Sequence, residues 1–347
     1  MNYNVIGIDI AKLVFQLYWI EMSTGEIKNL KLKREKFLAY FVNLAPCIIG
    51  MEACGGAHHW ARELTKLGHT VKLISGKRVK SFVMGNKNDA ADACAIWTAM
   101  QQPNTKEIAI KTVEQQAILT LHRQRECLKK IRTMQINALR GFLTEFGEVM
   151  PQSQAGLNKG IAAAIDRVSL ILPGVVIESL RDQWQRIGQL AEQMLNIERQ
   201  LQSWLKTSPE ASRLMAIPGV GLLSATAAVA NMGNAKRFQS GRQFAASLGI
   251  VPAQTGTGGK VRLLGISKRG DTYLRTLLIH GARSVLIHSK NPPKWLQELK
   301  QRRPMNVVVV ALANKMARMI WAILAHGRIY DAHWVSQVMT TAVVVEK

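Results

Sequence analysis

The sequence predicts an α/β domain followed by a mainly helical region. Two observations support this division: strand and helix patterns alternate over the first hundred residues, and the pattern from about residue 107 is purely helical. Apolar residues make up 48% of the 347 residues, which indicates a folded protein with a sizeable core. The formal net charge of +23 predicts binding to a polyanion, most simply nucleic acid. A solvated basic surface is the alternative.

The N-terminal elements can be assigned in order. Three strand patterns, "NVIGIDIA", "LVFQLYWIE" and "IKNLKLK", precede a short amphipathic helix, "REKFLAYFVNL". A buried strand then ends at Glu52, and the helix after it is closed by Gly68. A fifth strand, "TVKLIS", leads to the helix "NDAADACAIWTAMQ", which is capped by Asn88 or Asp89. The order β-β-β-α-β-α-β-α is that of a ribonuclease-H-like fold, a mixed sheet with helices on its faces.

Two long helices are predicted next. The first is "EQQAILTLHRQRECLKKIRTMQINALRGFLTEFG", stopped by Gly147, and the second spans roughly 175–206. In the second helix, apolar residues recur every seven positions: Leu180, Ile187, Met194 and Leu201. This spacing predicts an antiparallel arm or a dimer-forming coiled coil. We therefore divide the chain into a catalytic domain (1–105), an arm (106–206), a basic helical domain (207–330) and an unassigned tail (331–347).

Four carboxylates are predicted to converge. Asp9 lies at the end of the first strand, Glu52 ends the fourth, and Asp89 and Asp92 open the helix after the fifth. The first and fourth strands of a ribonuclease-H-like sheet are parallel neighbours, so their carboxyl ends meet. Asp89 and Asp92 are three residues apart and share one helix face.

Such a cluster needs cations, because converging carboxylates repel one another. Hard oxygen ligands select Mg²⁺ or Mn²⁺, and two such ions form a clamp suited to phosphoryl transfer. Taken singly, Asp89 has a simpler interpretation as a helix cap, and Glu52 as a buried acid with a partner. Asp9 has none, since an acid inside an apolar strand is costly unless it has a role.

The basic domain contains two candidate nucleic-acid motifs. "IPGVG" lies between two helix patterns and is typical of a helix-hairpin-helix module, in which Gly219 and Gly221 expose backbone N–H groups to a phosphate. A tight helix turn without a ligand is the alternative. The second motif is a flexible glycine loop whose hydroxyls can bind a phosphate or attack it. Its residues are Thr255, Thr257, Gly258, Gly259, Lys260 and Arg262, followed by Lys268 and Arg269.

The remaining features indicate the compartment. The four cysteines show no CxxC or zinc spacing, which suits a reducing environment. The N-terminus is a strand rather than a signal peptide, and the longest apolar stretch, 305–327, is interrupted by Lys315 and Arg318. We therefore expect a soluble, cytoplasmic protein without a membrane partner.

In this order, "GIDIAK", "MEACGG", "KNDAADA", "IPGVG" and "TGTGGKVRLLGISKRGD" resemble the DEDD transposases of insertion sequences guided by a bridge or seek RNA. The resemblance covers roughly residues 3–330. It implies a RuvC-like domain, a coiled-coil arm and a transposase domain. It also implies a recombinase that pairs donor and target DNA with a noncoding guide RNA, with a site shared between subunits of a dimer or tetramer. The Mg²⁺-binding tetrad would be Asp9, Glu52, Asp89 and Asp92.

The resemblance further implies a hydroxyl nucleophile that joins the protein covalently to DNA. The family's nucleophile is usually serine, and here Thr257 matches best, with Thr255 second. Plain phosphate binding by Thr257 is the alternative. Two other functions stay open: a RuvC-like junction nuclease that uses water, and a nucleic-acid-binding scaffold without catalysis.

Overall fold

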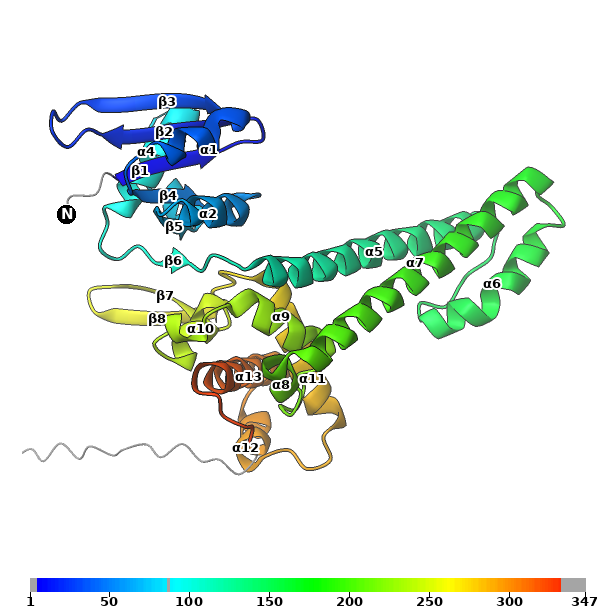
Figure 1. Ribbon diagram of the computed structural model, residues 1–347. Coiled ribbons are helices and arrows are strands. Elements are labelled where there is room, and N and C mark those ends of the chain that lie inside the picture. Colours follow the sequence, from blue (N-terminus) through cyan, green and yellow to red (C-terminus); the bar gives the residue numbers. More distant parts are fainter. Residues whose placement is uncertain (1–4, 86–87, 332–347) are drawn as a thin grey trace, which may run out of the picture. The chain divides into compact units, whose positions relative to one another are not determined.

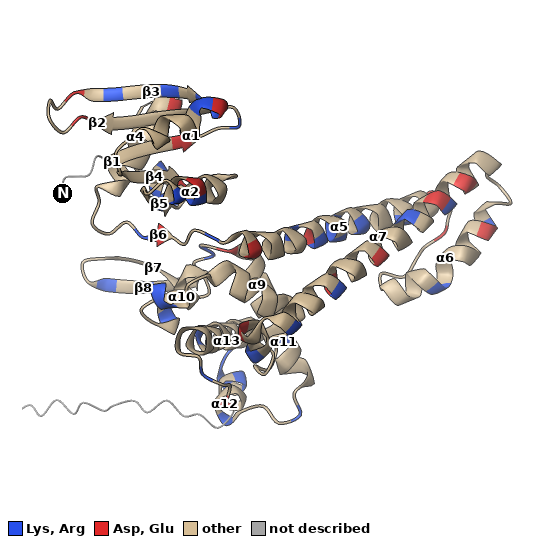
Figure 2. Ribbon diagram, in the orientation of Figure 1, with Lys and Arg blue, Asp and Glu red and all other residues tan. Residues whose placement is uncertain are grey.

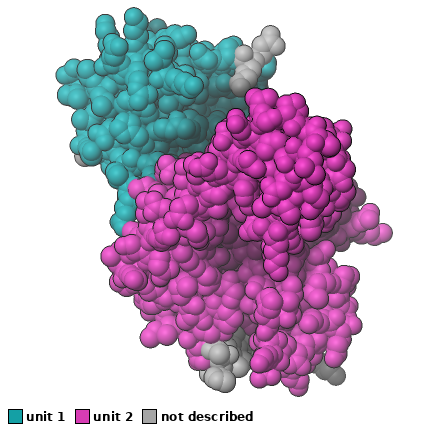
Figure 3. Space-filling model, turned by 90° about the vertical axis from the view of Figure 1, so that its right-hand side faces the viewer, with its two compact units in different colours: residues 1–116 teal, residues 117–347 magenta. Residues whose placement is uncertain are grey.

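The computed structural model describes residues 5–85 and 88–331. Apart from Asp331, the tail assigned to 331–347 lies outside the described residues. The chain forms two compact units, residues 1–116 and 117–347 (Figure 3). Each unit is considered by itself below.

The first unit is built on a six-stranded mixed sheet in the order β3-β2-β1-β4-β5-β6 (Figure 1). β1 is antiparallel to β2, and it is parallel to β4 as the sequence predicts. The short edge strand β6 is an addition to the prediction. The strands are β1 (Val5–Ile10), β2 (Val14–Ile20), β3 (Ile27–Lys33), β4 (Ile48–Glu52), β5 (Thr70–Ile74) and β6 (Glu107–Ile108).

Helices cover both faces of this sheet. On one face, α1 (Arg34–Val42) and α2 (Ala57–Lys66) pack aromatic rings against Phe15 of β2, with the Phe37 and Trp60 rings at 4.4 and 5.1 Å. On the other face lies α4 (Asp89–Met100), which contacts β1, β2 and β4. A short helix missed by the sequence analysis, α3 (Gly76–Lys80), follows β5. The layers are those of a ribonuclease-H-like domain.

Two long helices, α5 (Val113–Thr144) and α7 (Gly174–Thr207), run antiparallel. Arg125 of α5 pairs with Glu198 of α7 at 2.7 Å. Further along α5, the backbone carbonyl of Gln135 accepts from the side chain of Gln183, which comes before Glu198 in α7, at 3.0 Å. A further helix, α6 (Gln154–Val168), connects the two long helices and buries Leu157 and Ile161 against both. The sequence analysis did not predict it. The heptad residues Leu180, Ile187 and Leu201 are buried, but supercoiling of the pair stays a prediction.

The rest of the second unit is a helical bundle with one β-hairpin. Its elements are α8 (Pro209–Leu214), α9 (Leu222–Met232), the 3₁₀ helix η1 (Ala235–Arg237), α10 (Gly241–Ser247), β7 (Pro252–Thr257), β8 (Lys260–Ile266), α11 (Thr272–His288), α12 (Lys294–Arg302) and α13 (Met305–His326).

Helix α13 is the core helix of this bundle. By length and composition alone it is apolar enough to cross a membrane, so Lys315 and Arg318 do not exclude a span as the sequence analysis supposed. Many of its apolar side chains are buried, α13 contacts α8, α10, α11 and α12, and Met316 and Ile320 are inaccessible to solvent. Burial in the bundle core accounts for the apolar character of α13.

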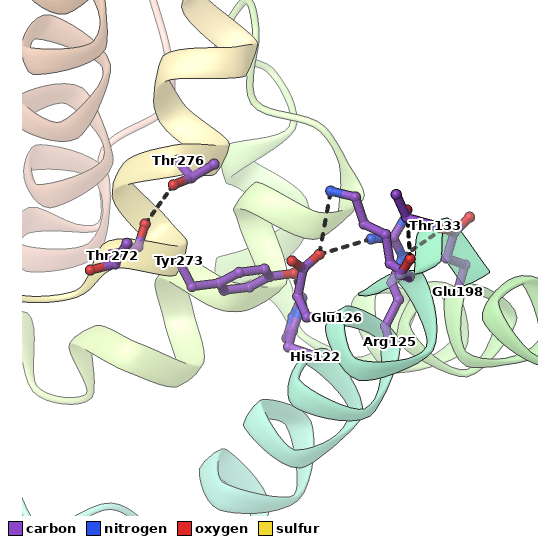
Figure 4. A network of polar contacts seen from close by, with 9 residues as sticks. His122, Arg125, Glu126, Thr133, Glu198, Thr272, Tyr273 and Thr276 are labelled. Atoms are coloured by element: carbon purple, nitrogen blue, oxygen red, sulfur yellow. Dashed lines mark hydrogen bonds and ion pairs between the residues drawn. The ribbon is translucent and has the colours of Figure 1, made fainter. Parts of the chain in front are cut away.

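A polar network joins α5 to this bundle (Figure 4). His122 of α5 is buried, with Tyr273 Oη 2.9 Å from Nδ1 and Thr226 Oγ1 3.0 Å from Nε2. Because the Thr226 hydroxyl donates to Leu222 O at 2.7 Å, it accepts from Nε2–H, and Tyr273 donates to Nδ1. Burial, with the charge of Arg125, lowers the pKa of His122 to about 4, so the ring is neutral.

The neutral state of His122 predicts that stability falls in acid. An unfolded histidine has a pKa of about 6.5, so between about pH 6.5 and 4 the unfolded state binds the proton that folded His122 does not. The free energy of unfolding of the wild type should therefore fall as pH drops through this window, and His122→Gln should lose that part of the dependence. Urea denaturation at pH 5 and 7 measures it, with His288→Gln at an exposed position as control. Equal pH dependence in wild type and His122→Gln would contradict this assignment.

Candidate active site

Asp9 and Glu52 lie on adjacent parallel strands. The register of β1 and β4 pairs Ile8 with Met51, so Asp9 and Glu52 occupy the next row of the sheet. Both side chains are half-buried. The predicted meeting of these two strand ends is confirmed.

Two glycines allow α4 to lie directly on this part of the sheet. A Cβ on Gly7 would stand 2.5 Å from Ala93 O and 2.7 Å from Trp97 N, and a Cβ on Gly50 would overlap the Met100 side chain. At Gly7 the neighbours are backbone atoms, so no larger side chain fits there, whereas at Gly50 the neighbour is the flexible side chain of Met100. The close approach brings the first turn of α4 to the end of β1 that carries Asp9.

That first turn carries Asp89 and Asp92. The helix cap is Asn88, whose side chain accepts from Ala91 N at 2.8 Å. Asp89 is therefore the first helical residue and not the cap, which removes the simpler interpretation of this carboxylate. Asp89 is exposed and Asp92 is half-buried.

The pKa of Asp9 reflects the other three carboxylates. Burial, followed in decreasing order by the negative charges of Asp92, Asp89 and Glu52, raises the pKa of Asp9 to about 6. Glu52 in turn is packed against Gly76 of α3, where a Cβ would overlap its carboxylate oxygen. Mutually repelling acids therefore lie near one another at this end of the sheet.

The chemistry of these donors fits a divalent metal ion. All four are carboxylates, which suit Mg²⁺ or Mn²⁺, and a cation would relieve the repulsion that raises the Asp9 pKa. Within residues 5–85 and 88–331, no three His, Cys, Asp or Glu side chains are close enough to hold one ion together. The four carboxylates thus lie at one end of the sheet, but they are too far apart to coordinate one ion together in this conformation.

The glycine loop of the basic domain is a β-hairpin rather than the flexible loop expected. Gly258 and Gly259 form its two-residue turn, with φ of 57° and 78°. Two positive φ values in a two-residue turn are the type I′ arrangement, which matches the twist of the strands. The sequence contains a signal for this hairpin, because a Gly-Gly pair between two extended segments is typical of a two-residue hairpin turn.

Pairing across the hairpin places both threonines beside cations. Thr257 faces Lys260 and Thr255 faces Arg262, and directly paired residues project to the same face. Figure 2 shows the basic residues on β8. Val261 and Leu263 lie on the opposite face and are 67% and 61% exposed. One face of the hairpin therefore offers hydroxyls with cations, and the other is apolar.

The base of the hairpin is held rigidly. Arg275 of α11 is buried, and its guanidinium donates to Leu248 O at 2.8 Å and Arg269 O at 3.0 Å, which lie before β7 and after β8. Lys268, with φ of 52°, donates its N–H to Gly249 O at 3.1 Å. Lys268 and Arg269 themselves are exposed. The hairpin therefore projects from a base that the hydrogen bonds of Arg275 hold together.

The helix-hairpin-helix glycines differ in their surroundings. Gly219 has φ of +84°, and a Cβ there would stand 2.7 Å from Gly281 O, so this glycine serves the close packing of the turn on α11. Gly221 is exposed at the start of α9 with open space around it. The carbonyl of Gly221 accepts from Ala225 N at 2.9 Å, so of the two glycines Gly221 has the more accessible backbone N–H for the predicted phosphate contact.

Comparisons with known proteins match both the first domain and the basic domain of the chain. Residues 6–148 match the DEDD transposase domain of the IS110 elements, and residues 211–299 match the domain described as "Transposase IS116/IS110/IS902 family". A probable family 20 transposase of Pseudomonas aeruginosa is 44% identical over 95% of this chain and 99% of its own length. The transposase for insertion sequence element IS1328 of Yersinia enterocolitica is 38% identical over the same shares. That for IS1111A of Coxiella burnetii is 39% identical over 95% and 92%.

Proposed function

This chain belongs to the IS110 family of insertion-sequence transposases, and from that premise we propose that it cuts and rejoins DNA under the guidance of a noncoding RNA. The single observation that carries the chemical part is the convergence of Asp9, Glu52, Asp89 and Asp92 at one end of the sheet. A transposase binds DNA, and a DEDD nuclease domain implies a divalent metal.

In this proposal the tetrad holds Mg²⁺ or Mn²⁺. Asp9 and Glu52 supply oxygens from the sheet, and Asp89 and Asp92 supply oxygens from α4. Bound there, the ion stabilises the negative charge that develops on the phosphate during displacement. The packing of α4 on Gly7 and Gly50 holds the helix that carries Asp89 and Asp92 beside the sheet, so rotation of the side chains would bring the four carboxylates to one ion.

The hydroxyl of Thr257 attacks the scissile phosphate in this scheme. A bond forms between Thr257 Oγ1 and phosphorus, the bond to the departing strand breaks, and the proton lost from Thr257 is balanced by the one the departing oxygen gains. Lys260 and Arg262, on the same hairpin face, hold the phosphate oxygens. The fixed root of the hairpin favours chemistry over loose binding, because a nucleophile must be held in position.

The proposal assigns the other parts of the chain accordingly. Residues 1–105 act as the RuvC-like domain, 106–206 as a coiled-coil arm that joins subunits, and 207–330 as the transposase domain. The assembly is a dimer or tetramer, since strand exchange requires several strand cuts. Gly221, Lys268 and Arg269 contact nucleic-acid backbone, and the complex acts in the cytoplasm.

Guidance by RNA is tested by purifying the chain from cells that carry the whole element and sequencing the copurifying RNA. We expect one structured RNA from the element's own noncoding region to be enriched over its cellular level, both for the wild type and for Asp9→Asn. The large positive charge supports such a partner. Recovery of RNA in proportion to cellular abundance would reject guidance and leave a protein-directed transposase.

A further inference from the structure

A row of paired residues crosses the sheet beside the tetrad. Asp9 of β1 pairs with Gln16 of β2, and Gln16 pairs with Lys31 of β3. Directly paired residues of antiparallel strands project to the same face. Lys31 therefore lies on the face of the sheet that carries Asp9, which is also the face on which α4 packs at Gly7.

Lys31 already reaches the tetrad. Its Nζ lies 3.7 Å from Asp89 Oδ2, and in the described part of the chain this is the one ion pair that involves any of the four acids. The two side chains are 62% and 61% exposed, so the pair contributes little to stability. Lys31 can thus exchange Asp89 for another anion at small cost, and the approach to the site is open to solvent.

We propose that Lys31 binds the scissile DNA phosphate at the border of the carboxylate site. The inference rests on the proposed cleavage chemistry of the tetrad. Four converging acids repel a polyanion, and a cation on the same face of the sheet offsets that repulsion where the phosphate must approach. The flexible lysine stem allows Nζ to turn from Asp89 to a phosphate oxygen while the strand stays in place.

The competing interpretation is that lysines on β3 only protect the edge of the sheet from pairing with another strand. Lys28 serves as the matched comparison. It lies on the same edge strand with the same charge, but its partner is Trp19, so it projects to the opposite face and pairs with Glu26 at 2.7 Å. An edge role predicts equal effects of Lys28 and Lys31, whereas a phosphate role predicts an effect of Lys31 alone.

The test compares Lys31→Ala, Lys31→Arg, Lys28→Ala and Asp9→Asn, each purified from cells that carry the whole element. Strand cleavage is measured on a supercoiled plasmid containing the element's ends, and Mn²⁺ binding to the protein is measured by calorimetry. Lys31→Ala should slow cleavage roughly 10- to 100-fold, as for loss of a hydrogen bond to a charged group. It should bind Mn²⁺ as tightly as the wild type or more tightly, because a competing cation has gone. Lys31→Arg should recover most of the rate, and Lys28→Ala should match the wild type.

Three results would overturn the inference. Cleavage by Lys31→Ala at the wild-type rate would show that Lys31 is not needed, and equal losses in both alanine variants would indicate a general charge effect. Loss of Mn²⁺ binding in Lys31→Ala would show that Lys31 supports the carboxylates instead of the DNA. The Asp9→Asn variant distinguishes failure of the proposed function from failure of the role of Lys31. If Asp9→Asn cleaves DNA normally, the proposed function is wrong. If Asp9→Asn is inactive and Lys31→Ala is fully active, only the role of Lys31 is wrong.

Discussion

Replacing Asp9 by Asn is expected to lower DNA strand cleavage by roughly a hundredfold or more while leaving the fold intact. Asp9 lies near Glu52 on the neighbouring strand and the acids of α4, and burial together with the negative charges of these three acids raises its pKa to about 6. Asparagine keeps the shape of the side chain and removes the charge that a metal ion needs. Cleavage of a plasmid carrying the element's ends measures the effect.

The same substitution should make the metal-free protein more stable at neutral pH. The pKa of Asp9 rises from 3.8 to about 6 on folding, so the folded state holds a proton that the unfolded state releases. The free energy of unfolding of the wild type should therefore fall as pH rises from about 4 through about 6, and Asp9→Asn should lack this fall. Thermal unfolding without added metal, at pH 4.5 and 7, measures it.

Asp166→Asn is the matched control, because Asp166 is 72% exposed on α6 and pairs loosely with Arg181 at 3.6 Å. It should change neither cleavage nor the pH dependence of stability. A cleaving Asp9→Asn protein, or one that is inactive because it is unfolded, would remove the support that this acid gives to the proposed chemistry.

The carboxylate site could be predicted from sequence because it depends on strand order. Period-two and helical patterns identified the strands that end at Asp9 and Glu52, and parallel neighbours bring their carboxyl ends together. The sequence also predicted the start of α4, but it left Asn88 and Asp89 both possible as the cap, and the hydrogen bond from Ala91 N assigns that role to Asn88. These are local signals combined with one rule of topology.

Two kinds of feature could not be predicted: those that depend on the pairing register of the strands, and those that depend on close packing at a glycine. Lys31 is 22 residues from Asp9 along the chain, and the two come into one row only through the pairing of both residues with Gln16. Gly7 and Gly50 read as weak strand residues, although they let α4 approach the sheet. The helix α6 was not predicted, although its sequence carries a helical signal: the buried residues Leu157, Ile161, Ala164, Ile165 and Val168 recur at helical spacing. What these residues pack against, α5 and α7, is known only from the structure.

Replacing Thr257 by Ala is expected to abolish the covalent protein–DNA complex. Thr257 ends β7 beside the Gly258–Gly259 turn, is exposed, and faces Lys260 across the hairpin. Alanine removes the only atom that can bond to phosphorus, whereas Thr257→Ser keeps the hydroxyl with less crowding and should retain the complex. A DNA substrate that traps the intermediate, run on a denaturing gel, measures this.

Thr255→Ala is the decisive comparison, because Thr255 projects to the same face two residues away and faces Arg262. Its loss should weaken phosphate contact without removing the covalent complex.

If Thr255→Ala removes the complex and Thr257→Ala keeps it, the nucleophile is Thr255. If both variants keep it, neither hydroxyl of this hairpin attacks DNA. If the wild type cuts DNA without any trapped complex, water is the attacking group and the hairpin only binds phosphate. The two variants share the hairpin, its fixed root at Arg275 and the loss of one hydroxyl, so a difference between them reports the attacking atom and not the stability of the fold.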